Sequence, residues 1–185
     1  MKGQTENRRV RMTKRLMKDA LLELLESRNL SGISVTAICE TADVHRSTFY
    51  KYYMDPADLL RDIEKDILEQ IPAPPPPPDR QKEEDLLNIT TAFFDFVRKN
   101  EKVFRILFSE SVNTGFFSRM VNLLCSQHID GIDTGNELSS RYLRLYIANG
   151  TVGMLREWVT TGFPISSREI AEMMYFLSRR VSEQG

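Results

Sequence analysis

A proline-rich segment lies near the middle of the chain and limits what the chain can fold into. Residues 72–78 read PAPPPPP and hold six of the eight prolines. Each proline lacks a backbone N–H, and its ring clashes with the preceding helical turn, so this segment cannot be helical. We expect a stiff linker in polyproline II geometry, and a docking site for an SH3-like partner is the alternative. Regular secondary structure is therefore expected only before and after it.

Helical periodicity dominates the rest of the chain, and strand signals are nearly absent. Apolar residues recur three and four positions apart in about nine stretches, as amphipathic helices require. The sequence therefore predicts an all-α fold of about nine helices. The first helix is expected over about residues 9–27, with these residues on its buried side: Leu16, Ala20, Leu21, Leu24 and Leu25.

Capping residues mark several helix starts. Ser34 is the expected cap of a short second helix, and Asp55 followed by Pro56 is expected to open a fourth. A tight turn is expected at Asp43, before a third short helix over about residues 46–52. Two later starts have capping-box spacing: Thr134 with Glu137, and Ser166 with Glu169.

Charge is segregated along the chain, although the net charge is only −1. Residues 1–54 carry 10 Lys/Arg and 6 Asp/Glu, a net of +4, whereas residues 55–185 carry 15 and 20, a net of −5. The basic charge of residues 1–54, beside the acidic charge of residues 55–185, indicates that the first part binds a polyanion.

Other features exclude several classes of protein. The two cysteines, Cys39 and Cys125, form no disulfide framework and favour a reducing cytoplasm. No secretory signal or membrane-spanning run is visible, so no membrane partner is expected. Cys125 and His128 are spaced as two metal ligands could be, but two ligands do not make a site. No paired nucleophile and base, phosphate loop or metal cluster is present, so we expect neither an enzyme nor a cofactor.

Residues 34–60 read SVTAICETADVHRSTFYKYYMDPADLL and predict a helix-turn-helix. Such a unit places its second helix in the major groove of DNA. That helix, about residues 46–52, carries hydroxyls and two cations but no carboxylate, so its polar groups suit phosphates and base edges. We therefore predict a DNA-binding domain over residues 1–54. Residues 55–185 would form a sensing and dimerisation domain that contains the linker.

Residues 42–53, followed by Leu59 and Leu60, closely resemble the TetR family signature, Ala-Gly-Val-Ser-x-x-Thr-Phe-Tyr-x-Tyr-Phe before a Leu-Leu helix start. With the basic first helix, the resemblance covers about residues 9–65. It implies a homodimeric repressor that an unknown small molecule releases from its double-stranded DNA operator. A regulator controlled by a partner protein, without a small-molecule pocket, is the alternative.

The resemblance also implies roles for individual residues. It implies that one set binds phosphates, namely Thr36, Thr48, Tyr50 and Tyr52, and that another faces the groove, namely His45, Arg46, Ser47 and Lys51. Arg46 is the best candidate to read a guanine, because a guanidinium can bond both O6 and N7. Four residues are expected in the core instead: Ile38, Phe49, Tyr53 and Leu60.

Three positions depart from the signature. Asp43 replaces the usual turn glycine, but Asp tolerates a left-handed conformation better than most residues. His45 replaces a serine cap, so a different arrangement of donors would open the third helix. Pro56 replaces a common lysine, so the backbone amides of that helix would have to serve for phosphate contact there.

The C-terminal part, residues 139–163, more loosely resembles a TetR subgroup common in Gram-positive bacteria. The resemblance rests on Tyr142, Tyr146, Gly150, Gly153, Trp158 and Gly162. It implies that the last two helices pair with those of a second subunit, or else serve only the internal core. The expected dimer residues are Gly150, Gly153, Ile170, Met173, Met174 and Leu177.

A sensor pocket is expected in the same part, as an apolar cavity with a few polar groups. A filled core is the alternative. Asn149 is the most suggestive residue, because an amide on an inward face needs partners. The candidate ligand-binding residues are Phe94, Phe104, Phe108, Met120, Tyr142, Tyr146, Asn149 and Trp158.

Overall fold

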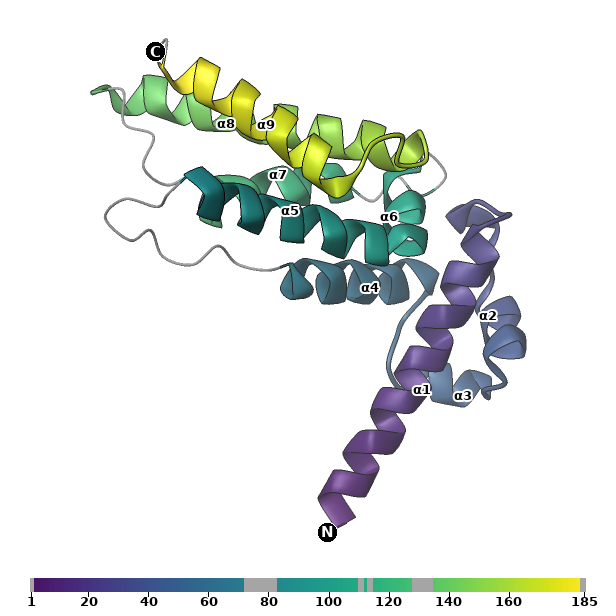
Figure 1. Ribbon diagram of the computed structural model, residues 1–185. Helices are drawn as coiled ribbons and strands as arrows, with labels where there is room; N and C mark the ends of the chain where they lie inside the picture. The colour runs from purple at the N-terminus through teal and green to yellow at the C-terminus, as the bar shows by residue number, and fades with distance from the viewer. Residues whose placement is uncertain (1, 72–82, 110–111, 113–114, 128–134, 184–185) are drawn as a thin grey trace. The chain divides into compact units, whose positions relative to one another are not determined.

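The computed structural model describes residues 2–71, 83–109, 112, 115–127 and 135–183. Within these ranges it contains nine α-helices and one short 3₁₀ helix but no strand, which confirms the predicted all-α class (Figure 1). The predicted linker at residues 72–78 lies outside them. The helices are α1 Lys2–Leu25, α2 Val35–Ala42, α3 Arg46–Tyr50, α4 Pro56–Gln70, α5 Glu83–Lys99, α6 Glu101–Phe108, α7 Phe116–Gln127, α8 Glu137–Thr160 and α9 Ser167–Glu183.

The helices form two compact units, which we call the head and the body. The head contains α1 to α3 and α4 as far as Glu69, and the body contains α5 to α9. The head is therefore longer than the predicted domain of residues 1–54. The physical reason is that α4 contributes to its core, with Leu59 and Leu60 fully buried.

The core of the head is built around the second half of α1. Met17, Leu21 and Leu25 are buried, as residues four positions apart on one helical face should be. Leu16 was expected there, but its side chain is 40% exposed. Leu16 lies five residues before Leu21 and so about 140° around the helix, away from the buried stripe.

Local signals determine the helix-turn-helix much as the sequence predicted. The hydroxyl of Ser34 accepts a hydrogen bond from the N–H of Ala37 at 3.1 Å and caps α2. Asp43 ends α2 with φ 52°, in the predicted left-handed conformation. His45 stands before α3 without a capping bond from its side chain. α3 ends at Tyr50, two residues earlier than predicted, because the chain continues as a turn.

In the body, α5 packs along α9, and α8 packs against α6 and α7 (Figure 1). The predicted capping box opens α9: the N–H of Ser166 donates to Glu169 at 2.8 Å, and the N–H of Glu169 donates to the Ser166 hydroxyl at 3.2 Å. The hydrogen bonds from Ser166 lower the pKa of the Glu169 carboxyl. The cap of α8 is Asn136 rather than the predicted Thr134, which lies outside the described residues.

Candidate nucleic-acid interface

α3 is held to the head by one aromatic anchor. Phe49 is fully buried, and its ring lies 5.8 Å from the rings of both Tyr50 and Tyr53. On a five-residue helix, burying one position leaves most of the remaining side chains at the surface. The four residues predicted to face the groove are all exposed: His45, Arg46, Ser47 and Lys51.

The predicted phosphate-binding residues also reach solvent. Thr36 is exposed on α2, Tyr50 is 53% exposed, and Thr48 and Tyr52 are half-buried. All four predicted core residues are buried, which confirms that part of the sequence analysis: Ile38, Phe49, Tyr53 and Leu60. The head therefore separates an apolar core from a polar surface on α2 and α3, and residues 44–54, which include α3, carry no carboxylate.

Lys14 of α1 adjoins this surface, which sequence reasoning missed. Its Nζ lies 5.8 Å from the ring centroid of Tyr52 and 5.2 Å from that of Tyr53. Lys51 reaches the Tyr52 ring too, with its Nζ at 5.7 Å. Two cations, one from α1 and one from the residue that ends α3, thus border Tyr52. The basic composition of α1 was visible in the sequence, but the particular lysine that meets the tyrosines after α3 was not.

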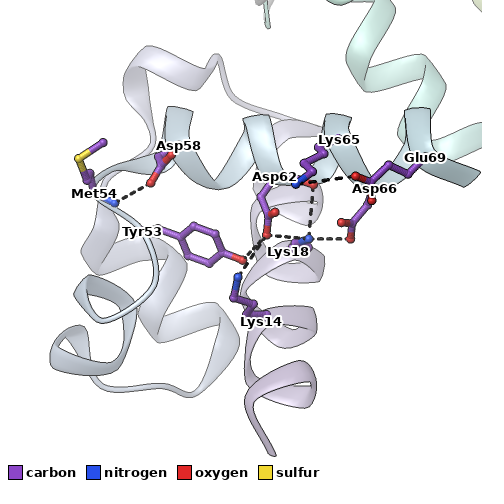
Figure 2. A network of polar contacts seen from close by, with 9 residues as sticks. All are labelled: Lys14, Lys18, Tyr53, Met54, Asp58, Asp62, Lys65, Asp66 and Glu69. Atoms are coloured by element: carbon purple, nitrogen blue, oxygen red, sulfur yellow. Dashed lines mark hydrogen bonds and ion pairs between the residues drawn. The ribbon is translucent and has the colours of Figure 1, made fainter. Parts of the chain in front are cut away.

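A polar network joins α1, α4 and Tyr53, which lies in the turn after α3 (Figure 2). The hydroxyl of Tyr53 donates to Asp62 at 2.7 Å. The ammonium of Lys18 lies 2.9 Å from Asp62 and 2.6 Å from Asp66. Burial, followed by the hydrogen bond to Asp62, raises the pKa of Tyr53. Burial alone would raise the pKa of Asp62, but the bonds from Lys18 and Tyr53 and the nearby lysine charges lower it overall.

The predicted sensor residues fall into two groups in the body. Five are buried: Phe94, Phe104, Phe108, Met120 and Trp158. Phe94 packs edge-on against Trp158, with centroids 5.2 Å apart, and Phe104 packs against Phe108 at 6.1 Å. The indole N–H of Trp158 donates to the carbonyl of Ile165 at 2.9 Å. These rings fill space against one another.

The other three predicted sensor residues are not on an inward face, which corrects the sequence analysis. Tyr142 and Tyr146 are 64% and 67% exposed. Asn149 is exposed too, and its amide is satisfied on its own helix by the carbonyl of Leu145 at 2.8 Å. The aromatic residues of α8 had suggested a single lined cavity, but α8 has apolar groups on opposite faces.

The predicted stripe on α9 also divides between two faces. Ile170 and Met174 are buried inside the body, whereas Met173 and Leu177 are 49% and 45% exposed. Ile170 and Met174 therefore belong to the chain's own core. Gly150 and Gly153 of α8 do not lie at close helix crossings within the body, because a Cβ built on either would meet nothing within 4 Å.

Comparison with known proteins identifies the class of protein. A family model described as the C-terminal region of TetR-type transcriptional regulators matches residues 84–180, more than half of the chain. The chain belongs to the TetR family. This TetR-family chain also matches an uncharacterized HTH-type transcriptional regulator, YxbF of Bacillus subtilis strain 168, at 25% identity over 172 residues. The match covers 87% of this chain and 43% of that protein, so the chain spans less than half the length of that relative.

Solved TetR-type structures share the fold. A regulator from Streptococcus agalactiae 2603V superposes with a TM-score of 0.71 at 16% identity, over 95% of this chain and 98% of that one. The dihydroxyacetone kinase operon activator DhaS gives 0.64 at 20% identity, over 92% and 96%. NalD of Pseudomonas aeruginosa, a secondary repressor of a multidrug efflux pump, gives 0.65 at 15% identity, over 93% and 97%.

The family to which the chain belongs is one of transcriptional regulators. Within the described ranges, no helix combines the length and the apolar composition that a membrane span needs.

Proposed function

We propose that this chain is a cytoplasmic, homodimeric repressor that reads its operator with α3. The observation that carries the proposal is the exposed, carboxylate-free surface of α3, held outward by the fully buried Phe49. Arg46 reads a guanine, while His45, Ser47 and Lys51 face the groove. Thr36, Thr48, Tyr50 and Tyr52 bind phosphates on either side.

Replacing Arg46 by alanine is expected to weaken operator binding and to relax base preference. A bidentate contact to guanine is worth about 1–3 kcal/mol, and a dimer would lose two of them. The measurement is a gel shift on the DNA upstream of the gene, with competitor DNA and a series of salt concentrations. For the native protein, the logarithm of the affinity should fall linearly with the logarithm of the salt concentration.

Arg28→Ala is the matched control for Arg46→Ala. Arg28 is also an exposed arginine of the head, but it follows the C-terminal end of α1 and is not on α2 or α3. Its loss changes the net charge equally and should leave base preference unchanged. Equal effects of the two substitutions, or native binding insensitive to salt, would rule out the proposed role of α3.

Repression, as opposed to activation, is tested by transcription in vitro. Among the solved neighbours, DhaS is named an operon activator and NalD a repressor, so the fold is compatible with both. We expect fewer transcripts from the upstream promoter as the protein is added. More transcripts would identify an activator.

The dimer we propose forms through exposed apolar surface on the last two helices. On α8, residues 138, 142, 145 and 146 recur at helical spacing and are all exposed leucines or tyrosines. On α9 the exposed apolar residues are Met173, Phe176 and Leu177. Gly150 and Gly153 have open space above their backbone, and glycine costs helix stability, so a close crossing with a second subunit explains their presence.

Tyr146→Glu is expected to shift the protein from dimer to monomer. The substitution places a carboxylate on apolar surface that a partner helix would bury. Burying that charge without an opposite charge beside it costs several kcal/mol. Analytical ultracentrifugation over a range of concentrations measures the shift. Asn122→Glu, on an exposed position of α7, is the control and should leave the dimer intact. A Tyr146→Glu dimer as tight as the native one would place the interface elsewhere.

Two kinds of effector are compatible with the body. In the first, a small molecule releases the repressor by entering among the buried aromatic residues around Phe94, Phe104 and Trp158. In the second, a partner protein controls it, which the direct ring-to-ring packing of these residues favours. Cell extract separated by ultrafiltration distinguishes them: release of the DNA by the low-mass filtrate supports the first, and release only by the retained macromolecules supports the second.

A further inference from the structure

Asp62 of α4 receives three groups from other parts of the head (Figure 2). One carboxylate oxygen, Oδ2, lies 2.7 Å from the Tyr53 hydroxyl, 2.9 Å from Lys18 Nζ and 3.8 Å from Lys14 Nζ. Two of these groups come from α1, and the third belongs to Tyr53, three residues after the end of α3. Asp62 therefore connects the scaffold helices to the chain that leaves α3.

Lys14 is the member of this network that can also reach DNA. Its side chain is 36% exposed, whereas that of Lys18 is 14% exposed. An ammonium has three donors, so a carboxylate on one side leaves others available. Lys14 Nζ lies close to the rings of Tyr52 and Tyr53, and Lys51 Nζ lies 5.7 Å from the centroid of the Tyr52 ring.

We propose that Lys14 joins Lys51 and Tyr52 in binding one DNA backbone phosphate, and that Asp62 is the positioning residue for this site. The inference rests on the proposed function of α3 and adds a contact from α1. The ammonium groups of Lys14 and Lys51 and the hydroxyl of Tyr52 are all donors that can bind phosphate oxygens. Asp62 holds Lys14 on α1 and Tyr53 after α3 at the same oxygen, which keeps the three phosphate-binding groups together.

Removing the charge of Asp62 has two opposite consequences for DNA binding. A carboxylate close to a phosphate-binding surface repels DNA, so its loss by itself should strengthen binding of any sequence. Its loss also frees Lys14 and the Tyr53 hydroxyl, which should weaken binding at the operator. The sign of the change therefore separates a positioning role from a purely electrostatic one.

Asp66→Asn is the matched control for Asp62→Asn. Asp66 lies one turn further along α4 and accepts a bond from Lys18 at 2.6 Å. Its substitution removes the same charge from the same helix, while the bond from Tyr53 to Asp62 and the approach of Lys14 remain. Both variants are measured on operator DNA and on unrelated DNA of equal length, with the active fraction of each preparation determined by stoichiometric titration.

We expect Asp62→Asn to bind the operator about ten-fold more weakly, a difference of about 1.4 kcal/mol, and unrelated DNA no more weakly than native protein. Asp66→Asn should bind both at least as tightly as native protein. A merely structural role of Asp62 would instead lower the active fraction and leave the ratio of the two affinities unchanged. Operator binding by Asp62→Asn equal to that of Asp66→Asn would overturn the proposal.

A second variant tests whether Asp62 acts through Lys14. Lys14→Ala should reduce the slope of log affinity against log salt by about 0.9 for each phosphate that is no longer neutralised. In that background, Asp62→Asn should change operator binding by less than about two-fold, because interacting residues are not additive. An unchanged salt slope, or full additivity, would remove Lys14 from the site. Absence of any operator preference in the native protein would instead contradict the proposed function itself.

Discussion

Phe49→Ala is expected to destabilise the head by about 3–5 kcal/mol, enough to abolish operator binding at growth temperature. Phe49 is fully buried, and its ring packs against those of both Tyr50 and Tyr53. α3 has only five residues, too few to be stable without tertiary packing. Truncating Phe49 therefore removes buried apolar area, and it also removes the packing that holds the exposed residues of α3 in place. Urea unfolding followed by circular dichroism measures the loss.

Tyr50→Ala is the control for this substitution. Tyr50 is the next residue of α3 and is also aromatic, but it is 53% exposed. Surface substitutions usually change stability by no more than about 0.5 kcal/mol. Comparable destabilisation by the two changes would show that burial of Phe49 is not what holds α3.

Trp158→Ala is expected to destabilise the body by about 3–5 kcal/mol as well. The indole is buried between Phe94 and Phe163, with ring centroids at 5.2 Å and 4.6 Å. It also donates to the carbonyl of Ile165 at 2.9 Å, so its removal leaves both a cavity and a carbonyl without its partner. The measurement is again the free energy of unfolding by circular dichroism.

Trp158→Phe separates these two contributions. A phenyl ring refills most of the cavity but cannot donate to Ile165, so we expect only the cost of the missing hydrogen bond, about 1–3 kcal/mol. If the phenylalanine variant were as unstable as the alanine variant, packing against Phe94 and Phe163 would not be the main source of stability. A native-like alanine variant would indicate a loosely filled core.

Features that depend on neighbours in the chain were predictable from the residues. The Ser34 cap, the left-handed Asp43 and the Ser166–Glu169 box involve groups within a few positions of one another. The buried positions of Phe49 and Leu60 followed from the family signature. Such predictions succeed because the hydrogen bonds and backbone conformations concerned are local and their geometry hardly depends on the remainder of the fold.

Features that depend on which face meets which partner were harder to predict. Tyr142, Tyr146 and Asn149 were expected inside but are exposed, because α8 carries apolar residues on opposite faces and periodicity cannot say which face is internal. Ile170 and Met173 were grouped in one stripe, but α9 buries the first in the body and exposes the second.

The amino-acid order of this TetR-family chain was sufficient to predict its helical class, its helix-turn-helix and most of its helix starts. It was not sufficient to say which cations are engaged by carboxylates. Asp62 is more than 40 residues from Lys14 and Lys18 in the chain, and only the packing of α1 against α4 brings it to them. Salt bridges and buried faces arise between elements distant in sequence, so their partners are decided when those elements pack.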